Sequence, residues 1–459
     1  MTETSQDRSY AALFAVPTIK RLLLGMTVAR IAGSMVSVAV ILFSLTHYNS
    51  PALTGIVTFA SLVPGILFSP IAGALLDRAG RTRLVIFDYF TSAMAMLAIA
   101  GLDTLGLLPV WALIVIVALS SITSPLSNSG LRSLFPILVP RHLWQRVNVV
   151  DSNSFVIAQL IGPPIAGVLI SIWGGDLGLA LIGLMFAVAA IITLGIPDPP
   201  VVASSTGRLF LDSWLGIAYT FRNATLRGLA IAFSTSKIGA GVLAIVMPVI
   251  LIERLNASPA IVGLAWGLSA AAQFFGALLI GRVETGPRDR AVIAASLGGY
   301  GFGLAILLAP PSIPLVFLAM LVTGALNAPA NVTMFTLRQR RTDPAWMGRA
   351  FAVSMSVSFA GYPLGSAIAG AFAEQSIVGP ILFGVATCVF SAVLAWRLIP
   401  AHGQEYDGPA SRASRAAAGA SAQPQPIGRP AGASPLAGER TAAASSPAAG
   451  PDVERLEPT

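Results

Sequence analysis

Long apolar runs alternate with short polar connections along most of the chain. A bilayer core about 30 Å thick requires roughly 20 apolar residues in a helix, and twelve runs approach or exceed that length. We expect membrane-spanning helices at approximately 22–46, 52–76, 84–102, 109–131, 149–172, 177–196, 227–252, 259–280, 291–309, 313–336, 349–373 and 378–399. Pro125 and Pro329 interrupt the fourth and tenth runs, which membrane helices tolerate. The pattern predicts an all-α, polytopic membrane protein.

Positive charge gathers in the connections on one side of these spans. Basic residues precede the first span, follow the even-numbered spans and end the twelfth: Lys20, Arg21, Arg78, Arg81, Arg83, Arg132, Arg141, Arg146, Arg208, Arg222, Arg227, Arg282, Arg288, Arg290, Arg338, Arg340, Arg341, Arg349 and Arg397. The other side carries Arg254. Because lysine and arginine in short loops stay in the cytoplasm, we expect both termini there and the chain in the cell (inner or plasma) membrane.

Composition excludes several classes of protein. Only 10% of the 459 residues are charged, against roughly 25% in soluble proteins. The net charge is +8, but the basic residues are scattered between apolar runs and give no nucleic-acid footprint. Met1–Val16 is polar, so no cleavable signal peptide is expected.

The sequence also offers no chemistry for catalysis. Cys388 is the single cysteine and lies in an apolar run, which excludes an intrachain disulfide. His47, His142 and His402 lie in predicted loops or the tail, with no Ser–His–Asp or metal-ligand spacing. We therefore expect no enzyme, no metal and no cofactor.

Two connections stand apart from the spans. Segment 197–226 places apolar residues at helical spacing and predicts an amphipathic helix on the inner membrane face, the alternative being an unstructured linker. Residues 401–459 are rich in Ala, Pro, Ser and Gly, which predicts a disordered tail. The expected organisation is a cytoplasmic segment 1–19, a six-helix half 20–196, the linker 197–226, a second half 227–400, and the tail 401–459.

An internal repeat supports this division. Gly73-Ala-Leu-Leu returns as Gly276-Ala-Leu-Leu, Arg146 as Arg349, and Gly162-Pro-Pro-Ile-Ala-Gly167 as Gly365-Ser-Ala-Ile-Ala-Gly370, each 203 residues later. Pro125 and Pro329 lie 204 residues apart, and Arg30-Ile31 and Lys237-Ile238 lie 207 apart. This register predicts two pseudo-symmetric six-helix halves with a substrate path between them, which opens by rocking one half against the other.

The stretch Gly73–Arg83, read G-A-L-L-D-R-A-G-R-T-R, resembles the signature loop between the second and third helices of the major facilitator superfamily. The stretches at 28–34, 134–148 and 216–229 are similar to the branch that holds the enterobactin exporter and macrolide efflux proteins. The resemblance covers roughly residues 18–400. It implies secondary active transport by alternating access.

The resemblance assigns a conformational latch to the signature loop. Asp77 would face the amino terminus of the eleventh helix near Gly348-Arg349, where the helix dipole favours an anion by ~0.3–1 kcal/mol. The alternative is ordinary positive-inside charge. The latch residues are Gly73, Asp77, Arg78, Gly80, Arg81, Arg83 and Arg349. The second copy has Ile280-Gly281 where the acid would stand, so only one half carries the complete latch.

The fifth span carries a second motif. Gly162, Pro163, Pro164 and Gly167 are similar to the G-P-x-x-G-G pattern of exporters, with Ala166 where a glycine is usual. The implied role is a bent helix packed against a helix of the other half. Generic helix packing is the alternative.

Two cations lie inside spans at equivalent positions. A charge at the bilayer centre costs ~2.5–3.5 kcal/mol on insertion scales, so Arg30 and Lys237 are predicted to face a watery cavity and to suit an anionic or carbonyl-rich ligand. The alternative is that each side chain snorkels to the surface. Gln159 and Asn327 complete the predicted substrate-binding set. Asn128, Gln273 and Asn331 are further polar candidates, although such residues also form plain interhelical hydrogen bonds.

Asp88 and Asp151 are the candidates for proton coupling, with ion pairing to Arg83, Arg146 or neighbouring groups as the alternative. Related exporters often have Gly-Asp where this chain has Gly33-Ser34, which puts the coupling residue in question. We predict proton-coupled efflux of small amphipathic molecules, such as macrolides or siderophore-like compounds. The alternative is an importer, or an exporter of one anionic solute. The expected partners are that substrate, protons and the lipid bilayer, with the chain a monomer.

Overall fold

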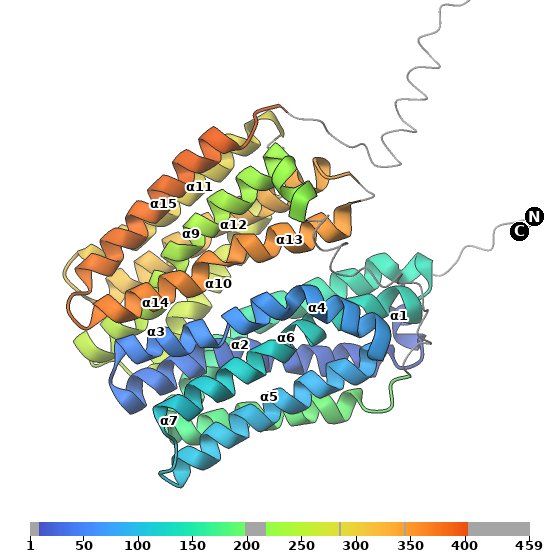
Figure 1. Cartoon of the computed structure of the whole chain (residues 1–459), viewed down its shortest axis with the longest axis horizontal. Coiled ribbons are helices and arrows are strands. Elements are labelled where there is room, and N and C mark those ends of the chain that lie inside the picture. The colour runs from blue at the N-terminus through green and yellow to red at the C-terminus, as the bar shows by residue number, and fades with distance from the viewer. Residues whose placement is uncertain (1–8, 198–216, 284–285, 344–345, 403–459) are drawn as a thin grey trace, which may run out of the picture. The chain divides into compact units, whose positions relative to one another are not determined.

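The computed structural model describes residues 9–197, 217–283, 286–343 and 346–402, and these residues are helical without a β-strand among them (Figure 1). The predicted tail 401–459 lies almost wholly outside the described residues. So does most of the linker 197–226, of which residue 197 and residues 217–226 are described; 217–222 and 224–226 are helical. The amphipathic helix of 197–226 therefore stays a prediction over most of its length.

The first half begins with a short helix and continues with long apolar ones. They are α1 (Tyr10–Ala15), α2 (Ile19–Tyr48), α3 (Pro51–Ala60), α4 (Val63–Ala79), α5 (Arg81–Thr104), α6 (Val110–Leu138) and α7 (Trp144–Thr193). Helix α7 has 50 residues, or ~75 Å at 1.5 Å per residue, far more than one bilayer. Gly174, with φ of 85°, breaks its helical backbone and divides it into the fifth and sixth spans.

The second half repeats this plan. Its helices are α9 (Ala224–Val249, prolonged by a π-helical turn Ile250–Arg254), α10 (Pro259–Ile280), α11 (Asp289–Ala305), α12 (Ile313–Arg340), α13 (Met347–Phe359), α14 (Gly361–Ala373) and α15 (Val378–Leu398). Ten described helices are long and apolar enough to cross a membrane. Dividing α7 at Gly174 and joining α13 to α14 as one span gives the twelve predicted crossings.

Two of the expected spans are interrupted. The second, predicted as one run over 52–76, breaks at Ser61-Leu62 into α3 and α4. The eleventh, predicted over 349–373, breaks at Ala360 into α13 and α14. Proline explains both breaks, because its ring suits the first turn of a helix and cannot continue a preceding one. Pro64 and Pro363 stand in the first turns of α4 and α14.

Each half is held together by contacts between its neighbouring helices. In the first half α7 packs against α2 and α5, and α6 packs against α4 and α5. In the second half α9 packs against α14 and α15, and α11 packs against α12 and α15. Large apolar side chains remain on the surface, for example Leu67 at 72% and Trp111 at 68% exposure. Lipid tails solvate such side chains, so the exposed apolar surface fits a membrane protein.

Two helix pairs make the most extensive contacts between the halves, and smaller contacts join α2 and α3 to α9 and α4 to α13. Helix α3 packs against α14, and α7 packs against α10. The contacts described below lie near the connections that follow the first, seventh and eleventh spans. This is the end of the bundle opposite the arginine-rich connections, and we call it the Ser50–Glu374 end.

Candidate transport site and the contact between the halves

Arg30 is held by an ion pair inside the first half. Its guanidinium donates from Nη2 to Asp151 Oδ1 at 2.6 Å and from Nη1 to the Asp151 carbonyl at 2.7 Å. Nη1 also donates to Ser154 Oγ at 2.6 Å. The pair joins α2 to α7, and both side chains are largely buried, with exposures of 14% and 6%. The charge of Arg30 is thus matched within its own half.

The partner of Asp151 differs from the partners that the sequence suggested. Ion pairing was the alternative to proton coupling for this acid, with Arg83 or Arg146 as the named cations; the structure supplies Arg30 instead. Sequence spacing could not reveal this, because the contact joins helices 121 residues apart. Substrate binding by Arg30 and proton coupling by Asp151 stay predictions.

Lys237, the equivalent of Arg30 in α9, has different surroundings. Its Nζ lies 5.4 Å from the ring centroid of Phe359, the last residue of α13. The side chain is partly buried. Among the described residues it forms no ion pair within 4.0 Å. The ring face offers a weak cation–π attraction and no compensating charge.

Asp88 lies inside the first half, on α5. It is 3% exposed, and its Oδ1 has no hydrogen-bond partner in the described part of the chain. The hydroxyl groups of Thr123 and Ser127 on α6 lie beside the carboxylate. A buried acid with one oxygen unsatisfied keeps its candidacy for proton transfer.

Two of the uncharged polar candidates, Asn327 and Asn128, donate hydrogen bonds to other parts of the protein. Asn327 on α12 donates to Gln273 Oε1 on α10 at 3.2 Å, which is the interhelical hydrogen bond that the alternative interpretation described. Asn128 donates to the Ser124 carbonyl of its own helix at 3.0 Å. Gln159 on α7 is exposed, and Asn331 on α12 is partly buried.

The predicted latch falls largely outside the described side chains, which do not include those of Asp77, Arg78 and Arg349. The backbone there has a sharp turn: Gly80 separates α4 from α5 with φ of 95°, a conformation that favours glycine. Helix α13 begins at Met347, as the latch requires of the eleventh span. The contact of Asp77 with that helix stays a prediction.

The exporter-like motif in α7 has two faces. Gly162 packs inside the first half, where a Cβ on it would lie 1.9 Å from Ser34 Oγ. Ser34 also donates to the Ala158 carbonyl at 2.7 Å. The position of Ser34, where related exporters often have an acid, is therefore closely packed. Gly167 packs against the other half, and a Cβ on it would lie 2.6 Å from the Pro259 carbonyl and 3.0 Å from Gly263 Cα.

The second helix pair reproduces this crossing. A Cβ on Gly370 of α14 would lie 2.6 Å from the Pro51 carbonyl and 2.8 Å from Gly55 Cα of α3. Gly370 lies 203 residues after Gly167, and Gly263 lies 208 residues after Gly55. The two crossings are therefore related by the pseudo-symmetry of the halves. In each, backbone contacts backbone with no side chain between them.

A repeated motif that the sequence analysis missed builds these crossings. Ser50-Pro-Ala-Leu-Thr-Gly55 starts α3, and Ser258-Pro-Ala-Ile-Val-Gly263 starts α10. Serine at the N-cap and proline in the first turn start the helix, and glycine one turn later permits the close approach. The repeat is visible in the sequence at an offset of 208 residues. Its meaning required knowing which helices of the other half it contacts.

One polar contact distinguishes the two crossings. Ser50 Oγ donates to Glu374 Oε1 at 2.6 Å, and the Ala52 N–H donates to the same oxygen at 3.4 Å. The Glu374 carboxylate thus lies at the amino terminus of α3, where the helix dipole favours an anion. Glu374 corresponds to Ser171 at the 203-residue offset, so the other crossing has no equivalent acid.

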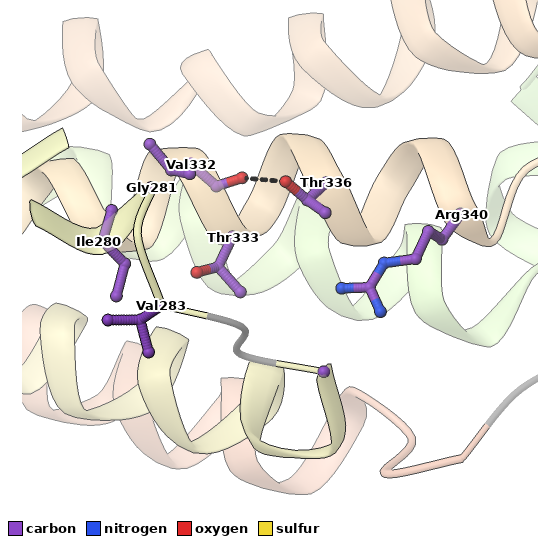
Figure 2. Close-up of a pocket in the computed structure, with 8 residues that line it drawn as sticks. Ile280, Gly281, Val283, Val332, Thr333, Thr336 and Arg340 are labelled. Carbon is purple, nitrogen blue, oxygen red and sulfur yellow. Dashed lines mark hydrogen bonds between the residues drawn. The ribbon is translucent and has the colours of Figure 1, made fainter. Parts of the chain in front are cut away.

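A cavity of about 380 Å³ lies in the second half (Figure 2). Its lining comes from the end of α10, the connection that follows it, and α12, and includes Val283, Thr333 and Arg340. Arg340 Nη2 donates to Asp289 Oδ2 at 2.9 Å, so the charge of this arginine is matched. The cavity lies at the arginine-rich end and includes none of the predicted binding residues.

The sequence profile of the Major Facilitator Superfamily matches residues 22–237 and again residues 229–444. The chain belongs to the major facilitator superfamily. An uncharacterized MFS-type transporter, y4rN of Sinorhizobium fredii, is 35% identical over 394 residues, which cover 85% of this chain and 97% of that protein. Macrolide efflux protein A of Streptococcus pyogenes is 23% identical over 76% of this chain and 88% of its own.

Solved structures agree on the fold of this superfamily member. The nucleoside transporter NupG superposes with a TM-score of 0.65 at 14% identity, covering 83% of this chain and 98% of that chain. At this identity the match concerns the fold alone. The resemblance drawn from Gly73–Arg83 is confirmed, as is the transporter architecture that it implied.

Proposed function

We propose that this protein is a secondary active exporter that moves small amphipathic molecules out of the cell in exchange for protons. Membership of the superfamily and the similarity to an efflux protein support transport and this direction. The positive-inside pattern supports a place in the cell membrane with both termini in the cytoplasm.

The observation that carries the proposal is the pair of pseudo-symmetric crossings at the Ser50–Glu374 end. Alternating access requires two halves that separate at one end while they close at the other. Backbone-to-backbone contacts of Gly55 with Gly370 and of Gly167 with Gly263 join the halves at the Ser50–Glu374 end. Given cytoplasmic termini, this end faces outward, and these crossings form the outer gate that must open to release the exported molecule.

Uptake into everted membrane vesicles tests the proposal. Vesicles that contain the protein and are acidified inside by respiration should take up a fluorescent amphipathic dye, and a protonophore should abolish this uptake. Absence of uptake, together with unchanged drug tolerance after deletion of the gene, would contradict the proposal.

A second candidate is import or export of one anionic solute without drug efflux. It is favoured by Lys237, a partly buried cation with no carboxylate partner among the described residues. Accumulation of a labelled anion by intact cells would support import, and its uptake only by everted vesicles would support export. Dye efflux independent of any such anion would count against this candidate.

A further inference from the structure

The two halves have a cation at equivalent positions, but the surroundings of the two cations differ. Arg30 and Lys237 lie 207 residues apart at equivalent points of α2 and α9. Arg30 has Asp151 as its counter-ion at 2.6 Å, and Ser154 adds a hydrogen bond. Its positive charge needs nothing further from a ligand.

The second half lacks the matching acid. The residue equivalent to Asp151, 203 positions later, is Ser354. Ser354 is fully buried, and its Oγ has no hydrogen-bond partner in the described part of the chain. The half thus keeps the cation and replaces the carboxylate by a hydroxyl group that is itself unsatisfied.

No other described carboxylate of the second half can take this role. Glu253, Asp289, Asp343 and Glu374 all lie at helix ends or in connections, and Asp289 is paired with Arg340. Lys237 lies in the middle of α9. A charge inside a membrane span is costly unless a partner or water compensates it. The position therefore favours a counter-ion that comes from outside the protein.

Phe359 limits the chemistry of that counter-ion. Its ring lies beside the Lys237 ammonium group at 5.4 Å and is 45% exposed. A molecule that brings an acidic group to Lys237 meets an accessible aromatic surface at the same place. This combination suits an acid that carries an apolar or aromatic body.

We propose that Lys237 binds the acidic group of the transported molecule, and that the substrates are amphipathic acids whose carboxylate, sulfonate or phosphate supplies in the second half the charge that Asp151 supplies in the first. This inference rests on the proposed transport function and names its substrate class. It also assigns the two cations different roles: Arg30 joins α2 to α7, and Lys237 binds the ligand.

Binding to the purified full-length protein tests the inference without transport. The probes are 2-naphthoate and 2-naphthalenesulfonate, with 2-naphthamide as the neutral analogue and 2-naphthylmethylammonium as the cation. We expect both acids to bind at least about tenfold more tightly than the amide, since hydrogen bonds to charged groups contribute that much. Lys237→Met should remove this preference, and Lys237→Arg should retain it.

Ser354→Asp is the decisive variant. It restores to the second half the acid that Asp151 provides in the first, so it should compete with the ligand for Lys237. We expect loss of the preference for acids with the melting temperature unchanged or raised. That result separates ligand competition from misfolding, because a misfolded variant would melt at a lower temperature.

Three results would overturn the inference: no binding of either acid, equal binding of acid and amide, or a preference that survives in Lys237→Met. They are distinguishable from failure of the proposed function. Dye transport by vesicles of the Lys237→Met variant at the wild-type rate would support the exporter function and contradict the role of Lys237 in binding. Acid-selective binding without any vesicle transport would support the binding site and contradict the exporter function.

Discussion

Gly55 and Gly370 touch backbone to backbone: a Cβ on Gly55 would lie 3.0 Å from the Cα of Gly370. The same Cβ would lie 2.6 Å from the Ser366 carbonyl oxygen. Since both neighbours are backbone atoms, no rotation of a side chain can make room. Whatever separates the halves at the Ser50–Glu374 end must break this contact and its counterpart at Gly167 and Gly263.

Alanine at either crossing should weaken the gate. In Gly370→Ala the added methyl meets the Pro51 carbonyl at 2.6 Å, and overpacking of this kind costs about 1–3 kcal/mol. The ratio of closed to open forms at this end should fall by roughly one to two orders of magnitude. The measurement is labelling of Ser50→Cys by a membrane-impermeant maleimide in a Cys388→Ala background, which should become faster. Gly167→Ala should behave alike because its crossing has the same geometry.

Gly101→Ala is the matched control for these variants. It also places a methyl group on a glycine inside a span, but no atom lies within 4 Å of the new position. Labelling and transport should match the parent protein. Equal effects of Gly101→Ala and Gly370→Ala would contradict the role of the crossing.

A disulfide across the Ser50–Glu374 contact should stop transport reversibly. The Ser50 hydroxyl lies 2.6 Å from the Glu374 carboxylate, so Ser50→Cys and Glu374→Cys in a Cys388→Ala background place one thiol on each side of this contact. Oxidation should hold this end closed and abolish efflux, and dithiothreitol should restore it. Each single variant, oxidised in parallel, is the control. Full efflux from the cross-linked protein would mean that this end does not open during transport.

The twelve spans, the two halves and the superfamily could be predicted because each depends on local sequence. Apolar run length fixes the crossings, and Gly73–Arg83 carries a specific spacing. The helix breaks at Ser61-Leu62 and Ala360 were not predicted, although Pro64 and Pro363 were visible, because proline alone does not separate a break from a tolerated bend.

The candidate site was less predictable because its contacts join distant residues. Arg30 and Lys237 occupy equivalent positions in the sequence, and only the packing of the helices shows that Asp151 neutralises the charge of Arg30. The repeated Ser-Pro-Ala-x-x-Gly motif of Ser50 and Ser258 was equally visible. Nothing local says that its glycine meets a glycine of the other half.

The Arg30–Asp151 pair should be costly to break from one side. Asp151→Asn leaves a largely buried guanidinium without its counter-ion, which typically costs about 3–5 kcal/mol. Arg30→Met removes the Arg30 partner of the acid, whereas the double variant Arg30→Met with Asp151→Asn removes both charges of the pair. We expect the double variant to melt closer to wild type than either single variant in detergent. Melting of the double variant at the temperature that additive single effects predict would refute a direct pair.

Asp88 is, beside Asp151, a candidate for proton coupling, and Asp88→Asn tests it. The carboxylate is 3% exposed, with Thr123 and Ser127 beside it, and asparagine keeps the shape while it removes the titratable group. If Asp88 carries the proton, the variant should lose dye accumulation driven by a pH gradient, while exchange of labelled for unlabelled dye across the membrane continues. Asp103→Asn, at the other end of α5, should retain both activities. Gradient-driven accumulation by Asp88→Asn at the wild-type level would remove Asp88 from the mechanism, and loss of exchange as well would assign it to structure rather than coupling.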